Sequence, residues 1–293
     1  MSINKAVIAA AGRGTRFLPV AKAYAKELVP VLAKPNIQYL VEEAIGAGIT
    51  NIAIVIRVGE TTIKNYFSPD KNLEKYLIEN NKIEYLDSLK NIWKKAKLTF
   101  IEQPLGLPYG TGSPVLAAKK FIGNDDFAYF YGDDFILETT PGQLLSKMIS
   151  KFYQYQASAI LAVQKVPMEE IYRYGSIKYI NDPNYPNRMS EILEKLPADQ
   201  APSNSVNIGR FIASNKILKN IDINKLSRDN ELWFTDALTK LAQSNIVLTQ
   251  STQDSLWLTT GDPLRWLKAN ISTALQDPTL KDDLSSFLKT LSV

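Results

Sequence analysis

A loop rich in glycine and cationic residues follows the first apolar segment of the chain. Residues 9–19 read Ala-Ala-Ala-Gly-Arg-Gly-Thr-Arg-Phe-Leu-Pro. Gly12 and Gly14 let the backbone come close to a ligand, while Arg16 and the later Lys26 supply positive charge. A buried strand that opens into such a loop can wrap a polyphosphate. This segment therefore predicts a nucleotide-binding loop.

The spacing of the two glycines excludes two other phosphate-binding loops. The Walker pattern needs a Gly-Lys-Ser/Thr ending, and the dinucleotide fingerprint needs a third glycine three positions after its second. Here Thr15, Arg16 and Phe17 follow Gly14. For the two glycines alone, a purely structural turn would be an equally good interpretation.

Two adjacent carboxylates follow a second apolar run. Tyr131-Gly132-Asp133-Asp134 comes directly after the apolar residues 127–130. Carboxylates at the carboxyl end of a parallel strand face the crevice where open α/β sheets bind ligands, and they are natural Mg²⁺ ligands. A turn or a helix cap is the alternative. Together with the loop at residues 9–27, the pair favours a metal site.

A glutamate and a lysine stand side by side later in the chain, at Glu194 and Lys195. They suit a ligand that carries hydroxyl groups at one end and a phosphate at the other. Without further context, such a pair on a strand is usually only solvated.

The composition limits the chemistry that the chain can perform. It contains 293 residues with no histidine and no cysteine, which excludes disulfides, thiol nucleophiles, histidine bases and the usual zinc sites. Nucleotidyl transfer remains, because its nucleophile is an already ionised phosphate oxygen that needs no base, and positioning and charge neutralisation carry the catalysis. The net charge of +4 does not argue for nucleic acid, and no apolar run approaches a membrane span. We expect a cytoplasmic enzyme, with a solvated helix face at the lysines of residues 90–97.

Apolar runs that alternate with helical patterns predict the elements that position these residues. Residues 35–48 show helical spacing between the first two strands, and residues 70–97 resemble a helical insertion over the nucleotide side of the sheet. Shorter, more polar runs after residue 170 suit an antiparallel addition that covers one end of the ligand-binding cleft. Expected strands are 5–11, 51–58, 98–103, 127–133, 158–166, 175–180, 189–195 and 205–213, and expected helices are 229–243, 262–276 and 278–291.

We therefore predict one domain over residues 1–293. Residues 1–170 would form a nucleotide-binding half with the insertion at about 70–97, residues 171–260 a sugar-binding half, and residues 261–293 C-terminal helices. For the last helix, packing on its own body is favoured over dimer contacts.

The motifs, taken together, resemble those of the sugar-1-phosphate nucleotidyltransferases. The signature Gly-x-Gly-Thr-Arg followed by Pro-Lys-Glu is similar to residues 12–27, and the Glu-Lys-Pro, Ala-Pro-Ser-Asn and Gly-Arg-Tyr motifs of uridylyltransferases resemble residues 194–211. The resemblance covers about residues 3–276. It implies a Rossmann-like, glycosyltransferase-A-like three-layer α/β fold with a mixed, mostly parallel sheet and a small antiparallel addition on the sugar side.

The resemblance also implies a reaction and its residues. UTP and α-D-glucose 1-phosphate would give UDP-glucose and pyrophosphate with Mg²⁺, in a homodimer or homotetramer that binds neither nucleic acid nor membrane. Catalytic roles fall to Arg16, Lys26 and Asp133, with Asp133 as the metal ligand. Nucleotide contacts fall to Ala10, Ala11, Gly12, Gly14, Thr15, Gln103 and Gly112, with Gln103 and a glycine amide on the uracil edge. Sugar-phosphate contacts fall to Gly175, Glu194 and Lys195.

The chain departs from the family pattern at several positions. Thr259 stands where the family has its second Mg²⁺ aspartate, and Ala25 replaces the proline before Lys26. A neutral hydroxyl is a poorer Mg²⁺ ligand than a carboxylate. Ser113 and Pro114 replace histidine and alanine, and Asp262 is expected to cap a helix. Thr235 and Asp236 are likewise expected to cap a helix near its first turn.

Two alternatives stay open at this point. One is the same chemistry on another substrate pair, such as dTTP with glucose 1-phosphate, or UTP with another sugar phosphate. The other is a regulatory protein that binds nucleotide sugars without catalysis, which the threonine at position 259 suggests.

Overall fold

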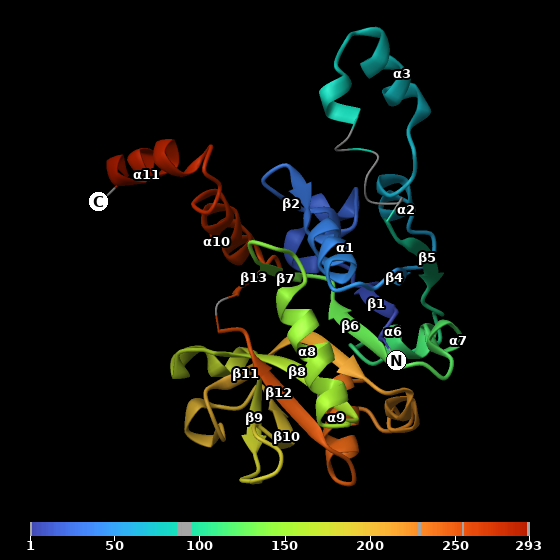
Figure 1. Ribbon diagram of the computed structural model, residues 1–293, viewed down its shortest axis with the longest axis vertical. Coiled ribbons are helices and arrows are strands. Elements are labelled where there is room, and N and C mark those ends of the chain that lie inside the picture. The colour runs from blue at the N-terminus through green and yellow to red at the C-terminus, as the bar shows by residue number, and fades with distance from the viewer. Residues whose placement is uncertain (1, 87–88, 90–94, 228–229, 254, 292–293) are drawn as a thin grey trace.

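A single mixed sheet with helices on both faces forms the body of the molecule (Figure 1). The computed structural model describes residues 2–86, 89, 95–227, 230–253 and 255–291. The nine strands of this sheet are β1 (Lys5–Ala10), β4 (Asn51–Ile56), β5 (Lys97–Glu102), β6 (Phe127–Tyr131), β8 (Ala159–Lys165), β9 (Gly175–Tyr179), β10 (Met189–Glu194), β11 (Ser205–Ala213) and β12 (Val247–Ser251).

Strand β1 lies between β4 and β6 and is parallel to both, and β5 continues the parallel part beyond β4. On the other side of β6, β11 runs antiparallel and joins β6 to β8 and β9. The antiparallel addition expected on the sugar side is therefore continuous with the main sheet. All nine residues of β11 are buried, so this strand is a central one.

Helices cover both faces of the sheet, which confirms the predicted three layers. Successive residues of β1 alternate between two cores, with Ala6 and Ile8 on one face and Val7 on the other. The first face is covered by α1 (Asn36–Gly46), α2 (Thr62–Tyr66), α8 (Gln143–Gln154) and α10 (Pro263–Ala274), and the second by α6 (Ser113–Ala117), α7 (Lys119–Ile122) and α9 (Phe234–Ala242).

Short elements complete the edge of the sheet at which β1 and β6 end. Strand β7 (Asp134–Leu137) pairs with β13 (Leu256–Thr259), and β2 (Pro30–Val31) pairs with β3 (Lys34–Pro35). The loop after β1 contains the 3₁₀ turns η1 (Thr15–Phe17), η2 (Val20–Lys22) and η3 (Lys26–Leu28).

The insertion is helical, but its described part does not cover the nucleotide side. Helix α3 (Lys71–Glu79) buries only Leu77 and stands out from the body in Figure 1. No described residue of 70–97 lines either of the cavities discussed below. Residues 87–88 and 90–94 lie outside the described residues, and with them Lys90 and Lys94 of the predicted basic cluster.

The two C-terminal helices bury few of their side chains. In α10, Leu264 and Leu267 are exposed, and the buried residues are Ala269, Thr273 and Ala274. Helical periodicity showed the helix but not which of its faces is covered. Helix α11 (Lys281–Thr290) buries none of its residues and points away from the sheet in Figure 1, so the expected packing on its own body is wrong.

Two predicted helix caps have different outcomes. Asp262 accepts a hydrogen bond from the amide of Arg265 and caps α10, as expected. At the start of α9, Thr235 and Asp236 lie inside the helix and do not cap it, and the Phe234 amide donates to the Thr111 hydroxyl. Among the described residues, we find no helix with the length and apolar character needed to cross a bilayer.

Candidate active site

The loop after β1 folds back so that Lys26 crosses beneath its two glycines. A Cβ on Gly12 would lie 3.3 Å from Cε of Lys26. Gly14 has a φ of 64°, and a Cβ there would lie 3.0 Å from the Cβ atoms of Ala21 and Lys26. The glycines therefore leave room for the lysine, in addition to bringing the backbone close to a ligand.

This loop forms one wall of a cavity of about 260 Å³. The opposite walls come from the segments after β5 and β6. Of the predicted site residues, it is lined by Ala11, Gly12, Gly14, Thr15, Arg16, Lys26, Gln103 and Asp133. The sequence prediction missed Arg13, Phe17 and Tyr109, which also line it and which lie close to the predicted motifs.

Two predicted nucleotide contacts are contradicted by the geometry. Ala10 is 1 % exposed and packs in the core, while its neighbours Ala9 and Ala11 line the cavity. The amide of Gly112 donates to the carbonyl oxygen of Leu232 at 2.7 Å, so this amide is not available to a base. Gly112 instead belongs to the turn at the start of α6.

Lys26 and Asp133 form an ion pair at the bottom of the cavity, with 2.6 Å between Nζ and Oδ2. Burial opposes both charges, but each group stabilises the other. Asp133 and Glu27 outweigh burial and raise the pKa of Lys26. Lys26 likewise outweighs burial and holds the pKa of Asp133 below its usual range. Both groups are therefore charged at neutral pH.

Asp134 differs from its neighbour in its protonation. Burial, together with the charge of Asp133, raises the pKa of Asp134 to about 7. Of the two adjacent carboxylates, Asp133 is therefore the one that is fully ionised at neutral pH, and it is the better cation ligand.

The backbone around Asp133 is held by several donors. Its carbonyl oxygen accepts a hydrogen bond from the Thr260 amide at 2.7 Å and from the Thr259 hydroxyl at 3.2 Å. The Thr259 hydroxyl also accepts from the Gly261 amide. Thr259 therefore stabilises the backbone of the residue that would hold the metal. It does so at the position where the family pattern has a second carboxylate.

The residues fit a metal that is held mostly by substrate. No cluster of three or more carboxylates, histidines or cysteines exists among the described residues. Mg²⁺ is often bound by one or two carboxylates plus substrate phosphates. Asp133 meets this requirement, because it lines the nucleotide cavity and also the second cavity described next.

A second cavity, of about 220 Å³, adjoins the first and contains the predicted sugar-phosphate residues Gly175, Glu194 and Lys195. A Cβ on Gly175 would lie 2.7 Å from Oε1 of Glu194, so only glycine leaves room for that carboxylate. Lys195 has a φ of 53°, which turns the chain just after the Glu194 carboxylate.

The same cavity has an aromatic wall that the sequence did not reveal. Trp233 lies with its ring centroid 5.1 Å from Nζ of Lys195, and its Nε1 donates to Glu231 at 3.0 Å. Trp257 lines the same cavity, as do Arg173 and Arg265. The position of Trp233 just before α9 gave no signal, since an aromatic residue there is commonly core.

The two cavities meet at a shared wall. Residues that line both are Arg16, Thr111, Tyr131, Asp133, Glu231 and Gly261. The cationic loop and the ionised carboxylate therefore lie between a site for a nucleotide and a site for a second anionic ligand. Such a junction can bring two phosphate-bearing molecules into contact.

The side-chain oxygen of Gln103 is buried in the first cavity and has no hydrogen-bond partner among the described residues. A buried acceptor without a partner is rare and indicates a ligand that donates to it. An amide side chain both donates and accepts, as the edge of a pyrimidine requires.

Replacing Gln103 by leucine should raise the KM for the nucleotide about tenfold, the cost of about one good hydrogen-bonding group. The KM for the sugar phosphate should stay within about twofold, because this ligand lies in the other cavity. Initial rates with each substrate varied in turn would show this. An equal rise in both KM values would mean that Gln103 only supports the fold.

Comparisons with known proteins agree with this arrangement. A family model described as "Nucleotidyl transferase" matches residues 5–275. A protein of Bacillus subtilis (strain 168), named UTP–glucose-1-phosphate uridylyltransferase, is 35% identical over 289 residues, which cover 99% of this chain and 97% of that protein.

Solved structures give the same result. The structure titled "UTP-bound UGPase from acinetobacter baumannii" has a TM-score of 0.87 and 33% identity over 99% of this chain and 100% of its own. A UDP-glucose pyrophosphorylase complexed with UDP-glucose has a TM-score of 0.80 and 30% identity over 94% of this chain and 100% of its own. With its matching fold and its two adjoining cavities, the chain belongs to the nucleotidyl transferase family.

Proposed function

We propose that this chain joins UTP and α-D-glucose 1-phosphate to form UDP-glucose and pyrophosphate. The observation that carries the proposal is the shared wall of the two cavities, where Arg16 and Asp133 face both. The similar proteins support the choice of substrates, since they are named for this reaction or were solved with UTP or UDP-glucose.

The reaction is an in-line displacement at phosphorus. A phosphate oxygen of the sugar phosphate attacks the α-phosphorus of UTP, the new oxygen–phosphorus bond forms, and the bond to the β-phosphate oxygen breaks as pyrophosphate leaves. The attacking oxygen is already ionised, so no base is needed. This suits a chain without histidine.

We propose the following roles for residues that line the two cavities. Arg16 neutralises the β- and γ-phosphates, and Lys26 stabilises the charge on the α-phosphate in the transition state. In the second cavity, Lys195 aligns the attacking phosphate. Glu194 accepts hydrogen bonds from the sugar hydroxyls, and Gln103 binds the uracil edge.

Nucleotidyl transferases generally use a divalent cation, and we propose Mg²⁺ here. Asp133 would hold it, together with the nucleotide phosphates. The cation would neutralise charge on the phosphates and the leaving pyrophosphate. Because Thr259 offers no second carboxylate, Arg16 and Lys26 carry a larger part of the neutralisation than in relatives that have both aspartates.

Thr259→Asp should lower the Mg²⁺ concentration for half-maximal activity about tenfold, since it adds a carboxylate beside Asp133. Thr259→Asn is the matched control, as it has nearly the same shape without the charge. Pyrophosphate release measured over a range of Mg²⁺ concentrations would compare the two. If both variants require as much Mg²⁺ as the parent, position 259 does not face the metal.

The substrate choice is tested by a panel of nucleotides and sugar phosphates. Purified protein would be given UTP, dTTP, CTP or ATP with glucose 1-phosphate, and UTP with other sugar 1-phosphates. We expect kcat/KM to be highest for UTP with glucose 1-phosphate. Equal use of dTTP would contradict the assignment of the base. The cytoplasmic location and the homodimer or homotetramer stay predictions.

A further inference from the structure

The largest side chain in the core is a charged one. Arg210, on β11, is 0 % exposed, although arginine is almost never buried without a specific partner. It lies in the segment Gly209-Arg210-Phe211, to which no role has so far been assigned. Its Cζ lies 4.9 Å from the ring centroid of Phe130 on β6.

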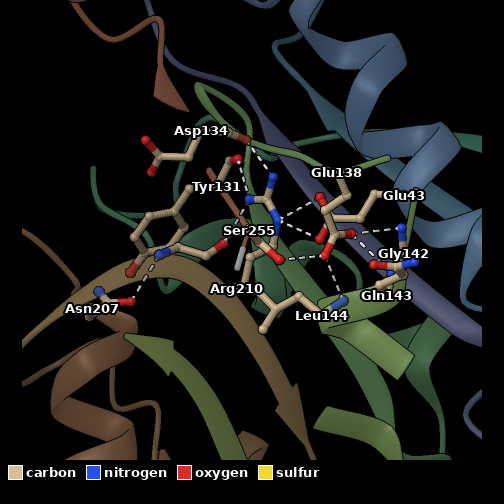
Figure 2. Close-up of polar contacts among 11 residues, drawn as sticks. Glu43, Tyr131, Asp134, Glu138, Gly142, Gln143, Leu144, Asn207, Arg210 and Ser255 are labelled. Atoms are coloured by element: carbon tan, nitrogen blue, oxygen red, sulfur yellow. Dashed lines mark hydrogen bonds and ion pairs between the residues drawn. The ribbon is translucent and has the colours of Figure 1, made fainter. Parts of the chain in front are cut away.

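The guanidinium group of Arg210 binds the turn that carries Asp133 (Figure 2). Its Nη2 donates to the carbonyl oxygen of Asp134 at 2.5 Å, and its Nη1 lies 3.5 Å from the carbonyl oxygen of Tyr131. One side chain thus contacts the backbone on both sides of the candidate metal ligand.

The two carbonyl groups between these contacts are also held. Nδ2 of Asn36 donates to the carbonyl oxygen of Gly132 at 2.6 Å. The carbonyl oxygen of Asp133 accepts from Thr260, as described above. A Cβ on Gly132 would lie 2.1 Å from the carbonyl oxygen of Ala9. The turn is therefore packed against β1 and held by hydrogen bonds at each carbonyl from 131 to 134.

Glu43 on α1 holds Arg210 in this position. Both carboxylate oxygens of Glu43 lie 3.0 Å from Nε of Arg210. The planar guanidinium can bind Glu43 through Nε and still direct both Nη atoms at the turn. A lysine, with one donor atom, could not do both.

Helix α1 is itself fixed close to this pair. A Cβ on Gly46 would lie 1.9 Å from the carbonyl oxygen of Pro141, so α1 contacts the start of α8 backbone to backbone. Glu138 accepts hydrogen bonds from the amides of Gln143 and Leu144 at the same helix start and from the Ser255 hydroxyl (Figure 2). Arg210 therefore joins the turn to a rigid part of the body.

We propose that Arg210 is a positioning residue, which orients the Asp133 carboxylate toward the metal and the α-phosphate while Glu43 serves as its counter-ion. This rests on the proposed function. Residues that orient a metal ligand typically change metal affinity or activity 10- to 100-fold when they are replaced. A group that only supports the fold would change the stability of the protein and leave its metal affinity unchanged.

The test uses a variant in which the ion pair is replaced by apolar residues, Arg210→Met with Glu43→Leu. Replacing a buried ion pair by apolar residues of similar volume is often neutral for stability, whereas removing one partner is not. Circular dichroism and thermal melting would establish that the variant is folded. Arg188→Met is the matched control, because Arg188 pairs with Asp182 and lines neither cavity.

The main readout is metal binding and not turnover. Binding of Mn²⁺ would be followed by electron paramagnetic resonance with a UTP analogue that has a methylene group between the α- and β-phosphorus atoms. We expect the Kd for Mn²⁺ to rise about tenfold and kcat to fall about 10- to 100-fold, with the KM for UTP within about twofold. If the parent protein bound Mn²⁺ and the analogue but released no pyrophosphate, the proposed function would fail while this test still applied.

A folded double variant with the parent Mn²⁺ affinity and kcat would overturn the proposal. So would an equal loss in kcat and in both KM values, which is the result of a general loosening of the fold. If the double variant did not fold, Arg210→Lys would decide by the same measurements. It keeps the charge but cannot reach Glu43 and both carbonyls, so the proposal requires the same weaker Mn²⁺ binding.

Discussion

Replacing Lys26 by methionine is expected to lower kcat for pyrophosphate release about a thousandfold. The ammonium group lies 2.6 Å from Asp133 at the junction of the two cavities, where negative charge from two phosphate-bearing substrates would gather. Methionine keeps the length of the side chain but provides no charge. A thousandfold loss corresponds to about 4 kcal/mol of transition-state stabilisation, which is typical of a preorganised group in a site that excludes water.

The control for Lys26→Met is Lys22→Met. Lys22 belongs to the same loop but is exposed and lines neither cavity. Its replacement should leave kcat within about twofold. Thermal melting of the Lys26 variant is needed as well, because methionine leaves Asp133 buried without its counter-ion. A folded Lys26→Met protein that retains more than a tenth of the parent kcat would refute the role of this lysine.

Asp133→Asn should also reduce kcat about a thousandfold, and it should raise the Mg²⁺ concentration for half-maximal activity at least about tenfold. Lys26 holds the pKa of Asp133 below its usual range, so the parent carboxylate is ionised at neutral pH. Asparagine keeps the shape but is a weaker ligand for Mg²⁺. The measurement is pyrophosphate release as a function of Mg²⁺ concentration.

Asp125→Asn provides the comparison for this variant. Asp125 precedes β6 at the end of the strand opposite the cavity and pairs with Lys5 at the surface. Its replacement should change neither kcat nor the Mg²⁺ requirement. An Asp133→Asn protein that lost activity but required the same Mg²⁺ concentration as the parent would show that Asp133 acts only through Lys26.

Much of this site could be predicted from short segments of the sequence. The glycines, Arg16 and Lys26 are close together in the chain, so their joint function follows from local spacing. Asp133 could be found because it follows an apolar run, and the carboxyl ends of parallel strands meet at one edge. The structure brings these residues together around one cavity.

The errors concern contacts between distant segments. The amide of Gly112 binds Leu232, which lies in another part of the chain, and no pattern around Gly112 indicates that partner. Similarly, the periodicity of residues 262–276 showed a helix but could not show that Leu264 and Leu267 are exposed. Sequence spacing defines an element, whereas its neighbours depend on the whole fold.

The role of Arg210 could also not be predicted from the sequence. A charged residue in an apolar strand has no evident purpose until Glu43, 167 residues away, is seen beside it. The turn that Arg210 holds is also remote in the sequence. Residues that position a catalytic group through its backbone are therefore difficult to recognise from local motifs alone.

The central claim is that the two cavities form one catalytic site. The most direct measurement is pyrophosphate release by the purified protein with UTP, glucose 1-phosphate and Mg²⁺, alongside calorimetric binding of UDP-glucose. We expect pyrophosphate to be released in an amount equal to the UDP-glucose formed, only when both substrates and Mg²⁺ are present. Tight binding of UDP-glucose with no pyrophosphate at saturating Mg²⁺ would contradict the claim and indicate a binding protein without catalysis.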